Sequence, residues 1–442
     1  MTGRRLSAIL ALLALFAAHA PLCAYTIQYA SATGLVARRW LTQPIIISLS
    51  TSLASPPPNI KAGSDVIGAV RRALRHWSSI SNVQFFETSS AVQTISPASA
   101  GDHVNLITVS GDNAAAFNSQ DIPGRTRVFS DASGAITEAD IALNPNVLFS
   151  TDGTVGTYDL ESTFTHEIGH LLGLEHSAIL GATMQPRQAT NGLFGLPAFT
   201  QRSLSDDDIA GARALYGSRA GTGSVSGRLV ATGGQAGPVF GAHVFAEEVS
   251  TGRVIAGSIS LHSGDYRIDG LPAGGYRVIG QGLDGLIEPE EIATARGSYA
   301  GLVETTPPFR TQIANWAATQ LIPVAADKGT SVGFFVSSNP PLLAPHLIGM
   351  NGELSTVALP LTPGKKVRIY IAGEGIDDVP AAGISSTSPF ISVDSESVNE
   401  EQFDTPYPAI SFEITVARNT PAGEYSILLQ SADGEIAYLV GA

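Results

Sequence analysis

The chain has 442 residues, of which 44% are hydrophobic, so it is too long for one packed core and we expect roughly two to four domains. Its formal net charge is −14 at pH 7. Such an acidic chain repels phosphates and anionic membrane surfaces, so neither nucleic acid nor membrane is an expected partner. The 46 glycines and 26 prolines predict many turns, with β-structure dominant in the later part of the chain.

Residues 1–24 have the pattern of a secretory signal peptide. Arg4 and Arg5 precede an apolar run from Ile9 to Ala18, and Leu22-Cys23-Ala24 offers a cleavage site. The apolar run is short for a membrane anchor, so we expect cleavage and export. Release outside the cell, attachment to the cell surface and residence in the periplasm stay open. Because the single cysteine lies in this segment, the mature chain is expected to contain no disulfide.

The next part of the chain predicts alternating strands and a long helix. The apolar, β-branched run from Pro44 to Leu49 is typical of a strand. Ser64 is suited to cap a helix, because apolar residues then recur at steps of three and four. These residues are Ile67, Val70, Leu74 and Trp77. Further strands are predicted at Val83 to Glu87 and at His103 to Val109.

Residues 166–176 carry the pattern H-E-x-x-H-x-x-G-x-x-H. Asp159 to Thr165 predicts the start of a helix, which places His166 and His170 on one helical face, where both can reach one cation. Gly173 is suited to end this helix in a left-handed conformation, so that the chain can turn and bring in His176. Three neutral imidazoles and one open position predict a single catalytic zinc ion. Glu167 lies beside it and can deprotonate the zinc-bound water.

The longer motif resembles that of the metzincin zinc endopeptidases, and its surroundings resemble the matrixin branch of bacterial type. Met184, in Ala182-Thr183-Met184-Gln185-Pro186, matches the supporting methionine turn beneath the metal. Ser177 after the third histidine and a closing helix from Leu204 to Gly217 are further matrixin marks. The resemblance implies an α+β, zincin-like catalytic domain at residues 25–217. In it, His166, His170 and His176 bind zinc, Glu167 activates water, and Gly173 and Met184 support the site.

The resemblance also implies how a peptide substrate is held. In matrixins an edge strand pairs with the extended substrate, and Arg127 to Asp131 is the matching candidate, although an ordinary loop with a short strand fits nearly as well. The loop after the methionine forms the wall of the pocket for the side chain that follows the scissile bond. Here that loop contains four large apolar residues, which either line a hydrophobic pocket or pack beneath the loop: Leu193, Phe194, Leu196 and Phe199.

Two features of animal matrixins are not expected here. A second, structural zinc needs histidines that this chain lacks, because His103 is the only one between Trp77 and Phe164. Nothing resembles the prodomain cysteine that keeps those enzymes latent, so we expect no cysteine-switch activation. Calcium has no motif of its own: Asp102, Asp140 and Asp152 could offer oxygen ligands, but capping or loop roles are favoured for them.

Beyond residue 217 the pattern changes to short strands and tight turns. Residues 218–224 are rich in glycine, serine and threonine and predict a linker. Residues 225–338 resemble a carboxypeptidase-regulatory-like, transthyretin-type β-sandwich with an irregular insertion around Asp284 to Trp316. Residues 339–442 have the alternation of an Ig-like β-sandwich. The predicted fold class is therefore a multidomain protein, with an α+β metzincin domain followed by two all-β sandwiches.

Two functions fit this organisation. The first is a secreted, monomeric zinc endopeptidase that hydrolyses internal peptide bonds of extracellular proteins, with a protein or peptide substrate as its partner. The second is a surface adhesion or matrix-binding protein in which the sandwiches carry the function. The intact histidines and the intact Glu167 favour the enzyme, and the sandwiches show no aromatic stripe or basic patch that would define a ligand.

Overall fold

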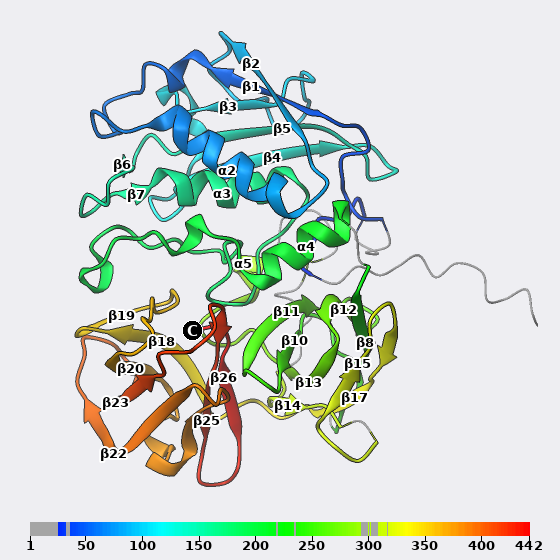
Figure 1. Ribbon diagram of the computed structural model, residues 1–442, viewed down its shortest axis with the longest axis vertical. Coiled ribbons are helices and arrows are strands. Elements are labelled where there is room, and N and C mark those ends of the chain that lie inside the picture. Colours follow the sequence, from blue (N-terminus) through cyan, green and yellow to red (C-terminus); the bar gives the residue numbers. More distant parts are fainter. Residues whose placement is uncertain are drawn as a thin grey trace, which may run out of the picture.

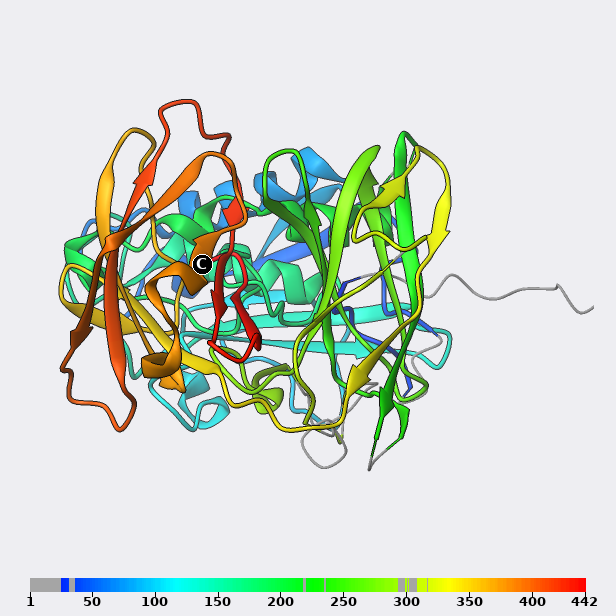
Figure 2. The same cartoon turned by 90° about the horizontal axis from the view of Figure 1, so that it is seen from below.

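The computed structural model describes residues 25–31, 36–217, 220–233, 236–292, 299, 301, 308–315 and 317–442. The predicted signal peptide, residues 1–24, lies outside this part of the chain. An α+β N-terminal domain (residues 25–217) rests on two β-regions that lie side by side beneath it (Figures 1 and 2). Among the described helices, none has the length and apolar character needed to cross a membrane.

The N-terminal domain is built on a five-stranded sheet with the order β2-β1-β3-β5-β4. β1 pairs in parallel with β2 and β3, and β3 pairs in parallel with β5, whereas β4 runs antiparallel at the edge. The strands are β1 (Ile45–Ser50), β2 (Phe85–Ser90), β3 (Leu106–Thr108), β4 (Gly124–Ser130) and β5 (Ile136–Leu143). A small parallel pair, β6 (Phe149–Ser150) and β7 (Tyr158–Asp159), precedes the motif helix.

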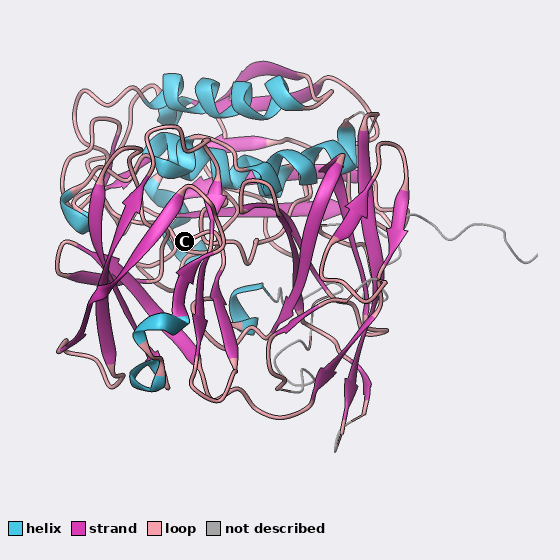
Figure 3. Cartoon of the chain, turned by 60° about the horizontal axis from the view of Figure 1, so that its bottom comes forward, coloured by secondary structure: helices cyan, strands magenta, loops and turns pink. Residues whose placement is uncertain are grey.

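Among the described residues of this domain, the α-helices are α2 (Val66–Ile80), α3 (Leu160–Leu171) and α4 (Asp206–Tyr216). In Figure 1, α2 crosses in front of the sheet, α3 lies next to β4 and α4 lies next to the β-regions; Figure 3 draws helices in cyan. The side chain of Asp65 caps α2 by accepting from the Gly68 N–H at 3.0 Å, so the cap predicted at Ser64 is wrong by one residue. Trp77 is fully buried, and its indole N–H donates to the Thr165 carbonyl at 2.8 Å, which ties α2 to α3.

The middle β-region (residues 220–338) has two sheets. The first contains β8 (Thr222–Thr232), β9 (Gly237–Pro238), β12 (Asp265–Pro272), β16 (Gly329–Ser331) and β17 (Phe334–Ser337). The second contains β10 (His243–Glu248), β11 (Arg253–Ile259), β13 (Gly274–Gln281), β14 (Gln312–Ile313) and β15 (Ile322–Val324). β8 begins at Thr222, inside the range 218–224 that the sequence predicts as a linker. Part of the predicted insertion lies outside the described residues, and the described part includes α5 (Pro289–Ile292).

The C-terminal β-region (residues 339–442) has a five-stranded sheet and a three-stranded sheet. The first has the order β19 (Glu353–Ser355), β18 (Ala344–Met350), β20 (Lys366–Glu374), β23 (Ala409–Val416), β22 (Ile391–Glu401). The second has the order β21 (Ile384–Ser386), β25 (Ile427–Gln430), β26 (Ile436–Leu439). One strand, β24 (Glu424–Tyr425), instead pairs antiparallel with β11. The two β-regions therefore share a sheet.

The start of α4 joins the N-terminal domain to the middle β-region. Asp206 forms an ion pair with Arg253 of β11. The neighbouring Asp207 is 7% exposed, and it accepts from the Ser177 hydroxyl at 2.6 Å and from the Gly257 N–H at 2.8 Å. A buried carboxyl group therefore lies directly in the contact between the two parts.

This carboxyl group predicts a pH dependence of stability. Burial, and after it the charge of Asp208, raises the pKa of Asp207 to about 7. Since the folded protein then binds a proton more tightly than the unfolded chain, Asp207 lowers stability progressively as pH rises from about 4 to about 7. Asparagine resembles the protonated form, so Asp207→Asn should lessen this fall, by up to about 3 kcal/mol at pH 7. Urea unfolding at several pH values measures the free energy of unfolding of wild type and variant, with Asp404→Asn, at an exposed position, as control. If the free energies of unfolding of wild type and Asp207→Asn change in parallel with pH, the prediction is wrong.

Candidate metal centre

The motif helix is positioned at both of its ends. At the start, the Asp159 side chain accepts from the Ser162 N–H at 2.9 Å and also pairs with Arg202. At the other end, Gly173 has a φ of +98°, as its place in the motif predicts. A Cβ atom there would lie 2.4 Å from the Arg38 carbonyl oxygen, so the turn has room for glycine only. At this tight turn the chain reverses toward the helix, which brings His176 close to His166 and His170.

The three histidines of the motif converge as predicted. One ligand atom from each of His166, His170 and His176 can be chosen so that all lie within 4.8 Å of one another. Their ring centroids are 4.8, 5.4 and 4.8 Å apart. In the described part of the chain, no other group of three histidine, cysteine or acidic side chains meets this criterion. We refer to these residues as the histidine triad.

Backbone carbonyls orient all three rings. The Nδ1 atom of His166 lies 2.8 Å from the Thr183 oxygen, that of His170 2.9 Å from the Leu174 oxygen, and that of His176 2.5 Å from the Glu291 oxygen. A carbonyl oxygen can only accept, so each Nδ1 carries the proton and each Nε2 keeps its lone pair. Histidine ligands of metals are commonly held in this way.

The charge state of the triad also suits a metal. Burial lowers the pKa of all three imidazoles, that of His166 to about 3. They are therefore neutral at physiological pH, which is the form that coordinates a cation. Three neutral, pre-oriented imidazoles fit zinc and leave one coordination position for water or substrate.

Glu167 lies beside the triad in a largely dry environment, 4% exposed. The hydroxyl of Thr126, on the edge strand β4, lies 2.5 Å from its Oε2 and 3.0 Å from its backbone oxygen. A Cβ atom on Gly124 would lie 2.5 Å from Oε1, so this glycine leaves room for the carboxylate. Burial raises the pKa of Glu167 to about 7, although the Thr126 hydrogen bond opposes the shift.

The methionine of the predicted turn packs against the motif helix. Met184 is 2% exposed, and its sulfur would lie 2.2 Å from a Cβ atom built on Gly169. The turn is held by Asp208, which accepts from the backbone N–H groups of Thr183 (2.7 Å) and Met184 (3.1 Å). Asp208 also completes the capping box of α4 with Ser205, so the closing helix and the methionine turn are one connected unit.

The loop after Met184 faces the C-terminal β-region. Leu193, Phe194 and Leu196 border a cavity of about 40 Å³ whose opposite wall is formed by Val357, Ala358 and Pro360. Phe199, the fourth apolar residue of the prediction, does not line this cavity. Its ring lies under the guanidinium of Arg202, whose Cζ is 3.7 Å from the ring centroid.

Phe194 connects this loop to the hairpin between β18 and β19. It has a φ of +59°, which is uncommon for a residue other than glycine. The Phe194 N–H donates to the Glu353 carboxylate, and the Asn351 amide donates to the Phe194 carbonyl at 2.7 Å. Contacts from another part of the molecule thus hold the loop conformation.

The three aspartates considered for calcium have protein partners. Asp140 accepts from the Ser96 N–H at 2.7 Å and the Leu106 N–H at 2.9 Å, and Asp102 accepts from the Val104 N–H at 2.9 Å. Asp152 forms an ion pair with Lys61. These contacts agree with the capping and loop roles favoured for the three aspartates.

Two residues that contact the site were not found from the sequence. Thr126 is 41 positions from Glu167, and Glu291 is 115 positions from His176. The predicted edge strand, Arg127 to Asp131, began just beyond Thr126, whereas β4 starts at Gly124. Near Thr126, only Gly124 suggests from the sequence that another side chain comes close to the backbone. No pattern around Glu291 indicates a contact with the triad.

Comparison with known families agrees with this geometry. The family model described as Matrixin matches residues 40–217, a range that includes the triad, Glu167, Met184 and α4. We call these residues, which the matrixin model matches, the matrixin domain. The family model ends at residue 217 and includes neither β-region.

Curated relatives are similar to part of the chain. The hatching enzyme of Paracentrotus lividus is 32% identical over 168 residues, which are 37% of this chain and 24% of that protein. Metalloendoproteinase 1 of Glycine max is 32% identical over 159 residues, covering 34% of this chain and 45% of the relative. Matrilysin of Rattus norvegicus is 32% identical over 151 residues, covering 34% and 50%. The chain thus spans from 24% to 50% of the length of these relatives.

Proposed function

We propose that the protein is a secreted zinc-dependent endopeptidase that hydrolyses internal peptide bonds of extracellular proteins. The observation that carries the proposal is the convergence of three neutral imidazoles beside the buried Glu167. The matrixin match and the relatives named as metalloendoproteinases support it. Secretion rests on the pattern of residues 1–24.

In this proposal, His166, His170 and His176 hold one zinc ion and Glu167 moves the proton. Zinc, when bound, supplies Lewis acidity that acidifies water and polarises a carbonyl. Glu167 accepts the proton of the attacking water and then delivers it to the leaving amide nitrogen, which becomes an amine. A carboxyl group with a pKa near 7 is suited to both transfers.

The proposal also assigns substrate-binding roles to the walls of the site. The edge strand β4 holds an extended peptide through main-chain hydrogen bonds, because its outer side has no partner strand in the described sheet. The cavity bordered by Leu193 and Phe194 receives an apolar side chain next to the scissile bond. Met184 supports the metal ligands without taking part in the reaction.

We further propose that residues 225–338 are a transthyretin-type sandwich and residues 339–442 an Ig-like sandwich, with the protein acting as a monomer. The adhesion function is not favoured, because the family match and the metal-type cluster both lie in the matrixin domain. The β-regions instead contact the loop after Met184 and one proposed ligand, His176.

The test uses the full chain, metal analysis and a quenched peptide library. We expect one zinc per chain, cleavage within peptides, loss of activity on chelation and recovery on addition of zinc. Mass spectrometry of the products identifies the cleaved bonds, and apolar residues are expected next to them. A chain that binds no zinc and cleaves nothing would favour the adhesion function.

A further inference from the structure

A short segment of the middle β-region reaches the proposed zinc centre. We call residues 283–292, which follow β13 and end with α5, the junction arm. In Figure 1, α5 lies between the matrixin domain and the two β-regions. The role inferred for this arm rests on the proposed zinc site.

The arm supplies one of the three carbonyls that orient the triad. The oxygens that hold His166 and His170 belong to Thr183 and Leu174, which are both within the matrixin domain. The oxygen that holds His176 belongs to Glu291 of the arm, 2.5 Å from Nδ1. The third ligand is therefore oriented by a segment from outside the matched family region.

The side chain of Glu291 ties the arm to the wall of the site. Its Oε1 forms an ion pair with Arg187, and its Oε2 accepts from the Glu288 N–H at 2.9 Å. Arg187 follows the methionine turn, and its own N–H donates to the Gln185 side chain at 2.9 Å. One residue thus contacts a metal ligand through its backbone and the pocket loop through its carboxylate.

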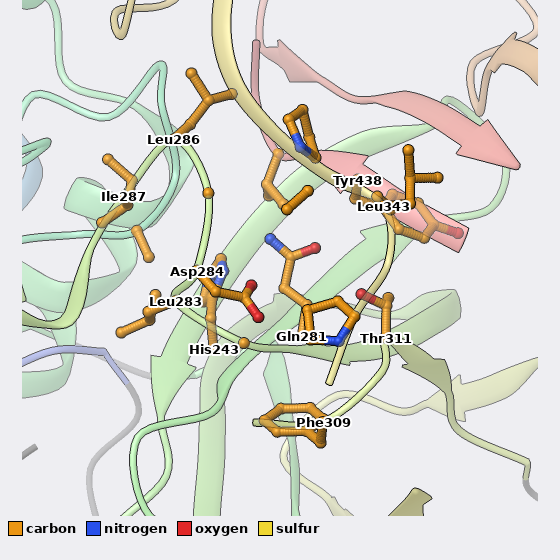
Figure 4. Close-up of a pocket in the computed structure, with 18 of the residues that line it drawn as sticks. His243, Gln281, Leu283, Asp284, Leu286, Ile287, Phe309, Thr311, Leu343 and Tyr438 are labelled. Carbon is orange, nitrogen blue, oxygen red and sulfur yellow. The ribbon is translucent and has the colours of Figure 1, made fainter. Parts of the chain in front are cut away.

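Packing holds the rest of the arm. Leu286, Ile287 and Ile292 are buried, at 7%, 6% and 0% exposure. Leu286 and Ile287 line a cavity of about 40 Å³ where all three parts of the molecule meet (Figure 4). Ala178 and Leu180, shortly after His176, line the same cavity, as does Tyr438 of β26.

Interdomain packing by itself would account for the buried side chains of the arm. It would not require a carbonyl directed at the Nδ1 of a triad histidine, nor a carboxylate bound to Arg187. The combination indicates that the arm sets the orientation of His176. Groups that orient a metal ligand from outside the first coordination sphere typically change metal affinity by about 10–100-fold when removed.

We propose that Glu291 is a positioning residue of the zinc centre, and that the junction arm of the middle β-region completes the metal site of the matrixin domain. Glu291 holds the His176 ring in the tautomer and direction that zinc binding needs. The Arg187–Glu291 pair keeps the Glu291 carbonyl in place. The middle β-region then contributes to the metal site by orienting one of its ligands.

The experiment compares full-length wild type with Glu291→Ala, Arg187→Gln, the double variant and Glu290→Ala. Glu290 is exposed and lies in the same helical turn, which makes it the matched control. Zinc affinity is measured by competition with a chromophoric chelator, and ligand geometry by the visible spectrum of the cobalt-substituted protein. We expect Glu291→Ala to lower zinc affinity by about 10-fold or more and to alter the cobalt spectrum, with Glu290→Ala unchanged.

The remaining variants separate positioning from general loss of structure. Arg187→Gln leaves the arm backbone intact and should weaken zinc binding in the same direction, and the double variant should be no weaker than Glu291→Ala because both act through one ion pair. Thermal unfolding of the metal-free proteins reports on folding. If folded Glu291→Ala and Arg187→Gln bind zinc as tightly as Glu290→Ala, the role of the arm is overturned while the proposed function stands. If wild type binds no zinc, both are overturned.

Discussion

Glu167→Gln is expected to lower kcat/KM for peptide cleavage by about 10²–10⁴-fold while one zinc ion stays bound per chain. The amide keeps the size of the side chain and can still accept the Thr126 hydrogen bond, but it cannot take a proton from water. Kinetics with a quenched peptide and metal analysis of the same sample measure the two effects together.

A second buried glutamate in the motif offers a matched control. Glu175 is 8% exposed, and burial raises its pKa to about 8 although Arg38 opposes the shift. It lies outside the proton path of the proposal, so Glu175→Gln should keep most of the activity. Proteolysis retained by Glu167→Gln, or lost equally in both variants, would contradict the role given to Glu167.

Asp159→Asn is expected to destabilise the protein by about 2–4 kcal/mol. The Asp159 carboxylate is completely buried and accepts from Arg202 at 2.8 and 2.6 Å while it caps α3. Asparagine can still cap the helix but leaves the arginine charge without its partner. Because α3 carries two triad histidines, zinc affinity should fall as well.

Unfolding in urea measures this loss, and Asp152→Asn is its control. Asp152 also pairs with a cation, Lys61, but the two side chains are 54% and 44% exposed. Solvent screens such a pair, so Asp152→Asn should destabilise the protein much less than Asp159→Asn does. If the two substitutions destabilise the protein equally, burial does not determine how much the Asp159–Arg202 ion pair stabilises it.

Local patterns predicted the centre of the site because its parts are close along the chain. Helical geometry alone places His166 and His170 on one face, and a left-handed Gly173 returns His176 within a single turn. The capping box that the structure shows between Ser205 and Asp208 joins residues equally close along the chain. Errors such as the Ser64 cap arose where two neighbouring residues could serve equally well.

The same reasoning could not place residues that meet the site from distant segments. Thr126 contacts Glu167 because β4 lies at the edge of the sheet, beside α3. The alternation of polar and apolar residues within one strand does not predict the order of strands in a sheet. The hairpin residues Asn351 and Glu353 hold Phe194 across more than 150 positions of sequence. β24 leaves its own region to pair with β11, which no local pattern indicates.

The sequence by itself determined the kind of centre: three imidazoles, a carboxylate and a methionine turn at short, fixed spacings. Backbone geometry over one helix and one turn suffices to bring these groups together. Only the tertiary structure decided what surrounds them, including the Glu291 carbonyl at His176 and the loop contacts from the β-regions. Those contacts depend on how separately folded segments pack, and spacing along a chain carries no information about that.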